Sequence, residues 1–238
     1  MIALLLAGGI GERLRPITNK IPKCLVQIGG RPLLDFWIES MIGINASKII
    51  INTHYHAEVV HEFIEQHQYK DKIEILFEPR LVGTGGTLRD AADRIKDEDV
   101  LVAHADNFCR APMDDFVNCF ETRRNEIEIT VMTFRTDTPS SCGIVETDDR
   151  GTVQKFFEKV SNPPSNLASG AVFLLSNDTV QFVRKQKPVH LDFSKDILPH
   201  YMGRINTWEN KIYHRDIGTP ESYLQCLKDW ENLQNKVI

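Results

Sequence analysis

The sequence lacks the features that identify membrane, secreted and DNA-binding proteins. No apolar run approaches the ~20 residues that a membrane span needs, and the N-terminus shows no signal-peptide pattern. The five cysteines form no C-x-x-C pair and are odd in number, which indicates reduced thiols. A formal net charge of −5 argues against nucleic acid held by bulk electrostatics, although locally basic grooves stay open. We therefore expect a cytoplasmic protein with no membrane or nucleic-acid partner.

The chain also lacks linkers, low-complexity tracts and internal repeats, hexapeptide repeats included. Its 238 residues suffice for one α/β domain with a sizeable core, so we predict a single domain over residues 1–238. The first half alternates predicted strands with predicted helices: strands over 2–6, 49–51, 73–77 and 100–102, and helices over 32–43, 56–67 and 84–94. This order is typical of a mainly parallel sheet with helices on both faces.

The second half has a different pattern. Strand-like segments recur without an obvious helix between them, over residues 127–134, 143–146, 153–157 and 171–175. A closing helix is predicted over 220–234, with Thr219 as its N-cap and Pro220 at its first position. We interpret residues 126–238 as mixed strands that extend the sheet of residues 1–125.

The most informative segment is Leu4–Leu25, LLLAGGIGERLRPITNKIPKCL. An apolar strand leads into a glycine-rich turn, whose N–H groups can point at phosphate oxygens, and Arg13 and Lys23 can neutralise the charge collected there. No Gly-Lys-Ser/Thr closes a Walker A loop, and Leu14 stands where the dinucleotide fingerprint needs its third glycine. A triphosphate cradle and a plain turn with a solvated cationic rim both fit the glycines alone.

Taken whole, this segment resembles the signature of the sugar-1-phosphate nucleotidylyltransferases (nucleotide-sugar pyrophosphorylases), G-G-x-G-x-R-L-x-P-x-T-x-x-x-P-K. The positions in register are Gly8, Gly9, Gly11, Arg13, Leu14, Pro16, Thr18, Pro22 and Lys23. Glu12 and Cys24 depart from the commoner Thr and Pro, and neither departure removes a phosphate-binding group. The resemblance implies a Rossmann-like three-layer α/β/α fold with a mixed, mainly parallel central sheet, of the nucleotide-diphospho-sugar transferase type. It also implies a nucleotide-binding half (1–125) and a sugar-phosphate-binding half (126–238).

Two acidic residues are candidates for a metal site. Asp106 follows a predicted buried strand, where a carboxylate is costly without a cationic partner, although Asp-Asn pairs are also common turn and cap formers. Asp216 begins the string D-I-G-T-P-E-S-Y, which otherwise reads as a strand end, a turn and a helix cap. Both positions resemble the family's metal carboxylates, which implies a Mg²⁺ ion that shares its shell with substrate and water. His104-Ala105 departs from the family's more usual residues before the first acid.

Glu78 is the residue from which we predict the base. The segment Glu78–Thr87 is similar to the family's nucleobase loop. A carboxylate only accepts hydrogen bonds, which suits the adjacent N–H donors of guanine and, as the runner-up, the amino group of cytosine. Glu78 could instead face solvent or pair with Arg80. The predicted nucleotide-binding residues are Leu6, Ala7, Gly8, Gly9, Gly11, Glu78, Gly83 and Thr84.

The sugar-phosphate site is predicted from shorter motif similarities in the second half of the chain. Cys142–Val145 is similar to the family's Y-G-x-V strand, with a cysteine where an aromatic residue or Arg is usual. The pair Glu158-Lys159 and the segment Asn166–Gly170 are similar to the family's sugar and phosphate loops. The resemblance therefore implies a sugar-phosphate site at Gly143, Glu158, Lys159, Asn166 and Ser169. A zinc site at His54, His56 and His61 is disfavoured because their spacing suits no usual zinc site and no cysteine is near.

The resemblance implies transfer of a nucleoside monophosphate from an NTP to a sugar 1-phosphate, with release of pyrophosphate. The attacking phosphate oxygen is already anionic, so positioning and charge neutralisation suffice. The predicted catalytic residues are Arg13 on the β- and γ-phosphates, Lys23 at the α-phosphate and the acceptor, and Asp106 at the metal. The strings G-T-G-G and D-I-G-T-P-E-S-Y are most similar to those of mannose- and heptose-phosphate guanylyltransferases, which favours GTP and a mannose- or heptose-type acceptor.

Several alternatives stay open from the sequence. A cytidylyl-, uridylyl- or thymidylyltransferase of the same family would use the same motifs. A catalytically silent nucleotide-sugar-binding regulator would keep the fold but should have lost a phosphate cation or a metal acid, whereas Arg13, Lys23, Asp106 and Asp216 are all present. Guanylyl transfer to a molybdenum cofactor shares the early A-G-G, but its shorter G-x-D-K ending differs from Arg15–Lys23. A homo-oligomer is compatible with all of these functions.

Overall fold

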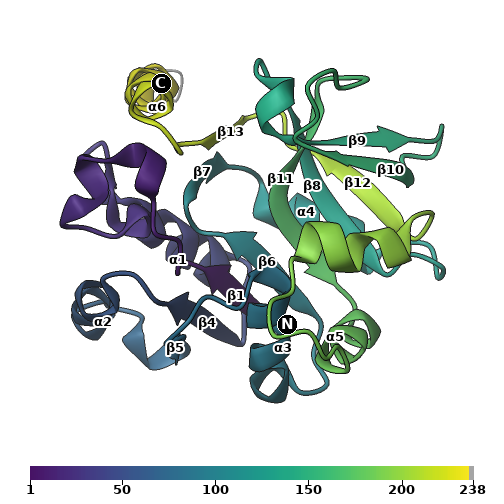
Figure 1. Ribbon diagram of the computed structural model, residues 1–238, viewed down its shortest axis with the longest axis horizontal. Helices are drawn as coiled ribbons and strands as arrows, with labels where there is room; N and C mark the ends of the chain where they lie inside the picture. Colours follow the sequence, from purple (N-terminus) through teal and green to yellow (C-terminus); the bar gives the residue numbers. More distant parts are fainter. Residues whose placement is uncertain (236–238) are drawn as a thin grey trace.

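A nine-stranded mixed sheet runs through the computed structural model, which describes residues 1–235 (Figure 1). The order β10-β9-β11-β6-β1-β4-β5 forms its main path, and β8 pairs with β11 and β12. The strands are β1 (Ile2–Leu6), β4 (Lys48–Thr53), β5 (Ile73–Phe77), β6 (Val100–His104), β8 (Ile129–Arg135), β9 (Gly143–Thr147), β10 (Val153–Glu158), β11 (Leu167–Leu175) and β12 (Ile205–Glu209). The predicted fold class, a mixed sheet between helical layers, is confirmed.

The first half supplies the parallel part of the sheet. Strand β1 pairs in parallel with β4 and β6, and β4 pairs in parallel with β5. The helices of this half are α1 (Leu33–Gly43), α2 (Ala57–Glu65), α3 (Thr84–Ile95) and α4 (Met113–Glu121). The strands and helices predicted from the first half are therefore confirmed, with ends that differ by a few residues.

Both faces of β1 are buried because helices cover both sides of the sheet. Leu4 packs into a core with α3 and α5 (Asn177–Arg184), while Leu5 packs into a second core with α1, α2 and α4. This explains why the strand reads as an uninterrupted apolar run rather than an alternating one. Because parallel strands end at one edge, the loops after β1, β4, β5 and β6 meet there.

The second half turns the sheet from parallel to mixed. Strand β11 runs antiparallel to β6, β8 and β9, whereas β12 runs parallel to β8. The strands predicted over this half are confirmed, but β11 begins earlier, at Leu167. Helix α5 was not predicted; its signal is the N-cap Ser176, whose side chain accepts a hydrogen bond from the amide of Thr179.

Helix α6 (Pro220–Asn235), at the upper left of Figure 1, covers a third cluster of apolar residues. It packs there on the hairpin of β2 (Gln27–Ile28) and β3 (Arg31–Pro32), and on β7 (Asn107–Arg110) paired with β13 (Tyr213–Asp216). The predicted closing helix and its cap are confirmed, since Thr219 Oγ1 accepts from the amide of Ser222 at 3.2 Å. Within residues 1–235, no helix combines the length and the apolar character needed to cross a membrane.

Candidate active site

The glycine-rich segment leaves β1 at the edge where the parallel strands end. Gly11 has φ +67, a conformation that favours glycine, and its carbonyl accepts a hydrogen bond of 2.7 Å from Thr18 Oγ1. Buried Leu14 and Cys24 anchor the segment in the apolar cores. Burial raises the pKa of the Cys24 thiol to about 12, so at this position the departure from proline supplies a small, inert apolar side chain.

Lys23 lies between the two predicted metal acids. Its Nζ is 3.0 Å from Asp106 Oδ2 and 2.9 Å from Asp216 Oδ1, and its side chain is only 7% exposed. The register of β7 with β13 pairs Asn107 with Asp216, which brings the second acid beside Asp106. Burial alone would lower the pKa of Lys23, but the two carboxylates raise it above its usual value.

The same pair of carboxylates fits a divalent cation. Two hard oxygen donors, one from the turn between β6 and β7 and one from the end of β13, already converge on one positive charge, the Lys23 ammonium. Among the described residues, no group of three or more acidic, histidine or cysteine side chains could hold a metal by itself. Asp106 and Asp216 therefore suit an ion such as Mg²⁺, which takes one or two carboxylates and completes its shell with substrate oxygens and water. Arg13 borders this site, with Nη2 3.8 Å from Asp216 Oδ2 and 68% of its side chain exposed.

A cavity of about 230 Å³ opens beside the glycine loop. Its lining includes Asp106, Asn52, Thr87, Leu81 and two histidines, together with six of the predicted nucleotide-binding residues: Leu6, Gly8, Gly9, Glu78, Gly83 and Thr84. The other two predicted residues, Ala7 and Gly11, do not line it. Ala7 instead donates its amide to Asn52 Oδ1 at 2.6 Å, and Gly11 shapes the turn.

Glu78 is buried in this cavity rather than exposed or paired with Arg80, since only 4% of the residue is accessible. Its Oε1 accepts from Thr87 Oγ1 at 2.6 Å and from Asn52 Nδ2 at 3.2 Å. Its Oε2 is enclosed and has no hydrogen-bond partner in the described structure. A buried acceptor without a partner is costly, so this oxygen is suited to a donor on a ligand.

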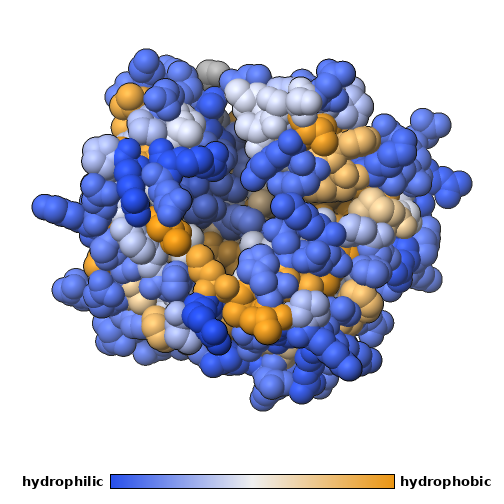
Figure 2. All heavy atoms as spheres, in the orientation of Figure 1, coloured by the Kyte–Doolittle hydropathy of each residue, from blue (hydrophilic) through white to orange (hydrophobic). Residues whose placement is uncertain are grey.

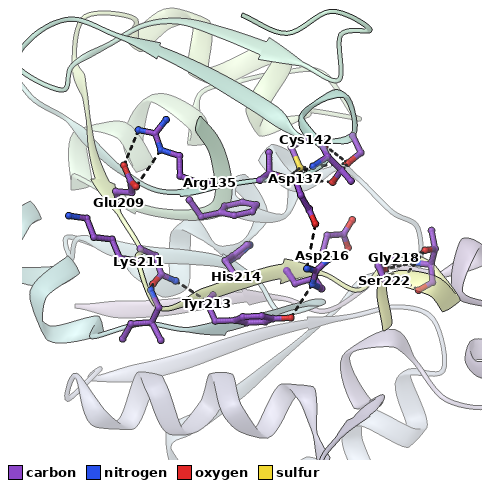
Figure 3. Close-up of a pocket in the computed structure, with 18 of the residues that line it drawn as sticks. Arg135, Asp137, Cys142, Glu209, Lys211, Tyr213, His214, Asp216, Gly218 and Ser222 are labelled. Carbon is purple, nitrogen blue, oxygen red and sulfur yellow. Dashed lines mark hydrogen bonds and ion pairs between the residues drawn. The ribbon is translucent and has the colours of Figure 1, made fainter. Parts of the chain in front are cut away.

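A second cavity, of about 640 Å³, has Asp216 and Arg13 in its lining. Figure 3 shows His214 and Asp216 projecting from β13 on one side of it, with Arg135 and Cys142 on the other. His214 stacks on Phe134, and its Nδ1 is enclosed without a partner in the described residues. Burial lowers the pKa of His214 to about 4, so the imidazole is neutral near pH 7. On the face seen in Figure 2, the molecule is hollowed between its two halves.

The predicted sugar-phosphate residues lie on β9, β10, β11 and the loop before β11. Gly143 pairs with Glu158, and a Cβ at Gly143 would lie 3.0 Å from Glu158 Oε2. Lys159 is 3.5 Å from Glu158 Oε1, while Asn166 accepts from Arg135. Ser169 Oγ accepts from the amide of Ala171. None of the five is among the residues that line either cavity, so their contact with substrate stays a prediction.

Sequence reasoning did not single out Asn52, Thr87 or His214. Asn52 follows three isoleucines in β4, near the end of the strand and at the same edge of the sheet as Asp106. A polar residue directly after this apolar run was the available signal. Thr87 stands within the Glu78–Thr87 segment but, as an interior helix residue, carries no signal of its own. His214 precedes Asp216 by two residues on one strand, so the two side chains share a face.

The three histidines near β4 do not form a cluster. His54 Nδ1 lies 2.8 Å from the carbonyl of Glu78, His56 Nε2 lies 3.1 Å from that of Asn19, and His61 Nε2 lies 3.0 Å from Thr53 Oγ1. Each ring has its own partner, which agrees with the prediction of a strand end and a helix surface.

Known proteins resemble this chain in sequence along most of its length. A mannose-1-phosphate guanylyltransferase of Mycobacterium tuberculosis is 25% identical over 232 residues, which cover 95% of this chain. A mannose-1-phosphate guanyltransferase of Yarrowia lipolytica is 27% identical over 236 residues, again 95% of this chain. The chain spans 64% of the length of each of these relatives.

Solved structures share the fold at lower identity. HddC from Yersinia pseudotuberculosis, complexed with GMP-PN, superimposes with a TM-score of 0.80 at 23% identity, covering 96% of this chain and 99% of that one. A UDP-glucose pyrophosphorylase complexed with UDP-glucose gives a TM-score of 0.82 at 19% identity, with coverage of 97% and 98%. The sequence profile of the nucleotidyl transferase family matches residues 2–232. The chain therefore belongs to the nucleotidyl transferase family, as its glycine-rich segment predicts.

Proposed function

We propose that the protein transfers a nucleoside monophosphate from an NTP, preferably GTP, to a sugar 1-phosphate, giving a nucleotide-sugar and pyrophosphate. One observation carries the proposal: one ion-paired cluster, Lys23 with Asp106 and Asp216, connects the linings of the two cavities. Asp106 lines the smaller cavity, Asp216 lines the larger one, and Lys23 contacts both acids. Two substrates, one in each cavity, would have their phosphates at this cluster.

The smaller cavity suits the donor nucleotide. The glycine loop offers backbone N–H groups for phosphate, and Glu78 Oε2 offers an unpartnered acceptor for the base. Guanine presents two adjacent N–H donors, and Glu78 Oε2 has two lone-pair sites with which to accept them. Guanine is supported over the other bases by the relatives named as mannose-1-phosphate guanylyltransferases and by the crystal structure of HddC in complex with GMP-PN.

The larger cavity suits the acceptor. Its walls carry polar and charged side chains with hydrogen-bonding capacity, among them Arg135, His214 and Asn210, as sugar hydroxyls require. The same relatives favour a mannose-type sugar 1-phosphate. The predicted contacts of Glu158 and Lys159 with the sugar and its phosphate belong to this proposal.

The chemistry needs no general base. An anionic oxygen of the sugar phosphate attacks the α-phosphorus, a new P–O bond forms, and the bond to the β-phosphate breaks as pyrophosphate leaves with the electron pair. Lys23 neutralises the two approaching phosphates and holds them in line. Arg13 and the loop amides hold the departing pyrophosphate. A Mg²⁺ ion on Asp106 and Asp216 would supply further charge neutralisation to the phosphate oxygens.

A silent nucleotide-sugar-binding regulator is the competing function. Such a protein has no need to keep two acids and a buried lysine at a single point, because an unreactive ligand can be held by neutral groups. This chain has all four groups, and they form one series of contacts: Arg13 with Asp216, Asp216 with Lys23, and Lys23 with Asp106.

The test is a matrix assay of pyrophosphate release, with GTP, CTP, UTP and dTTP against a panel of sugar 1-phosphates. We expect release to be fastest with GTP and a mannose- or heptose-type acceptor, and to depend on both substrates. Release with UTP or dTTP as the best donor would contradict the argument from Glu78. Tight nucleotide binding without release from any pair would instead favour the regulator.

A further inference from the structure

A single buried amide connects the glycine loop to the base-reading carboxylate. Asn52 stands near the end of β4 and is only 4% exposed. It lines the smaller cavity, and its two polar atoms bond to different groups, Oδ1 to the glycine loop and Nδ2 to Glu78. A side chain placed between two functional groups can fix their relative position.

One end of Asn52 holds the start of the glycine loop. Its Oδ1 accepts hydrogen bonds from two successive amides, Ala7 N at 2.6 Å and Gly8 N at 3.2 Å. Both donors are backbone groups, which require an oxygen opposite them. The amide therefore cannot flip, and its Nδ2 is left to donate to another group.

The other end of Asn52 holds Glu78. Nδ2 donates to Glu78 Oε1 at 3.2 Å, and Thr87 donates to the same oxygen at 2.6 Å. With two donors on Oε1, the carboxylate is held so that Oε2 is the oxygen without a partner. The orientation of the base acceptor thus depends on an amide whose own orientation is set by the loop.

We propose that Asn52 is a positioning residue that fixes the base-reading carboxylate of Glu78 relative to the phosphate-binding loop. It sets the distance between the base and the phosphates of a bound NTP and so favours one register of the nucleotide. The role rests on the proposed function in one respect, namely that the smaller cavity holds the NTP.

Three variants separate the two ends of the amide. Asn52→Asp keeps an oxygen for the amides of Ala7 and Gly8 but replaces the donor to Glu78 with a second carboxylate, which repels it. Asn52→Ala removes both ends. Thr87→Val removes the other donor to Glu78 and does not touch the loop, so it serves as the matched variant.

The measurement is calorimetric binding of GTP and of inorganic triphosphate, each with Mg²⁺, to the full chain. For Asn52→Asp and Thr87→Val, we expect GTP affinity to fall about tenfold or more, the size of one hydrogen bond to a charged group. In Thr87→Val, triphosphate affinity should stay within about twofold, because the loop contacts remain. In Asn52→Asp, it should fall less than GTP affinity does, because the added negative charge lies beside the loop but the loop contacts remain. Asn52→Ala should weaken both ligands.

The proposal is overturned if Asn52→Asp weakens GTP and triphosphate equally, as a general structural defect would, or weakens neither. Melting temperatures of the variants identify such a defect directly. If Asn52→Ala does not fold, the affinities of Asn52→Asp and Thr87→Val for GTP and triphosphate still test the proposal. If the wild-type protein binds another NTP more tightly than GTP, the choice of GTP as donor is wrong but the role of Asn52 is not yet contradicted. The variants would then be compared with that NTP in place of GTP.

Discussion

An ammonium group enclosed to the degree of Lys23 must be held by opposite charge, because burial alone favours its neutral form. Asp106 and Asp216 supply that charge from positions 83 and 193 residues away in the sequence. Their side chains are 31% and 48% exposed, so water reaches the acids but hardly reaches the lysine. The centre can therefore exchange partners on its open side while the cation stays in place.

We expect Lys23→Ala to reduce the rate of transfer by about 10³-fold, the size of effect found when one preorganised electrostatic contact is removed. The fold should survive, because water can screen the two half-exposed carboxylates once the lysine is gone. Pyrophosphate release measures the rate, and circular dichroism checks the fold. Lys20→Ala, an exposed cation of the same segment, should leave the rate almost unchanged. Near-normal turnover in Lys23→Ala would remove Lys23 from the mechanism.

Glu78→Gln tests the base acceptor with nearly the same shape. Its amide oxygen can keep the hydrogen bonds from Thr87 and Asn52, which places an N–H₂ donor where Oε2 now lies. We expect kcat/KM for GTP to fall about 10- to 100-fold, since each hydrogen bond to a charged group is worth about 1.5–3 kcal/mol. The ratio of UTP to GTP use should rise. An unchanged preference among the four NTPs would show that Glu78 does not read the base.

Helix α6 holds the strand that carries Asp216. Trp230 packs edge-on against Phe36 and Phe108, with ring centroids 5.4 and 5.6 Å apart. It also covers the β2–β3 turn, where a Cβ at Gly29 would lie 2.0 Å from the indole Nε1. The helix thus closes the third apolar cluster over the pairing of β7 with β13.

Trp230→Ala should therefore destabilise the protein. Because Trp230 is only partly buried, we expect the free energy of unfolding to fall by about 2 kcal/mol, less than for a fully buried aromatic residue. Urea denaturation measures the change. Leu224→Ala on the same helix is the control, since Leu224 is 57% exposed and should change stability by less than about 0.5 kcal/mol. Equal effects of the two changes would contradict the anchoring role of Trp230.

Elements with strong local signals could be predicted from the sequence. Ile2–Leu6 and Ile73–Phe77 are observed as predicted, and Pro220 begins the last helix. Helix α5 escaped notice because its eight residues give a short pattern within a region rich in strands. Strand β13 is shorter still, at four residues, and its pairing with β7 joins residues more than 100 positions apart in the sequence. Such contacts are set by packing rather than by local propensity.

The candidate site shows the same division. The motifs of one family predict that Lys23, Asp106 and Asp216 lie together. In the structure, Lys23 Nζ is 3.0 Å from Asp106 and 2.9 Å from Asp216. The two ends of Asn52 could not be foreseen, because an amide's orientation depends on which donors surround it. The predicted sugar residues were placed by short local similarities, which do not specify tertiary contacts, and none of them lines the larger cavity.

Ion pairs between elements make the stability of the whole protein depend on pH. Asp35 of α1 accepts from Arg31 and lies 2.8 Å from His67 Nε2, at the end of α2. Glu74 of β5 contacts Lys48 of β4 at 2.9 Å and Arg94 of α3 at 2.6 Å. Burial alone would raise the pKa of Asp35, but its hydrogen bonds hold the pKa below the usual value, and Lys48 does the same for Glu74.

A carboxyl group with a lowered pKa in the folded state stabilises the fold above its unfolded pKa of about 4. That contribution is lost as the pH falls from there through the folded pKa. We therefore expect Asp35→Asn to be less stable than wild type at pH 7, by about 1.5 kcal/mol, and the difference to shrink as the pH falls to ~3, because the unfolded state then binds a proton that folded Asp35 binds only at lower pH. Urea unfolding at both pH values measures the difference. Glu65→Gln, an exposed acid on α2, should show no such dependence, and a gap for Asp35→Asn that persists undiminished in acid would mean that the lost stability comes from packing and not from charge.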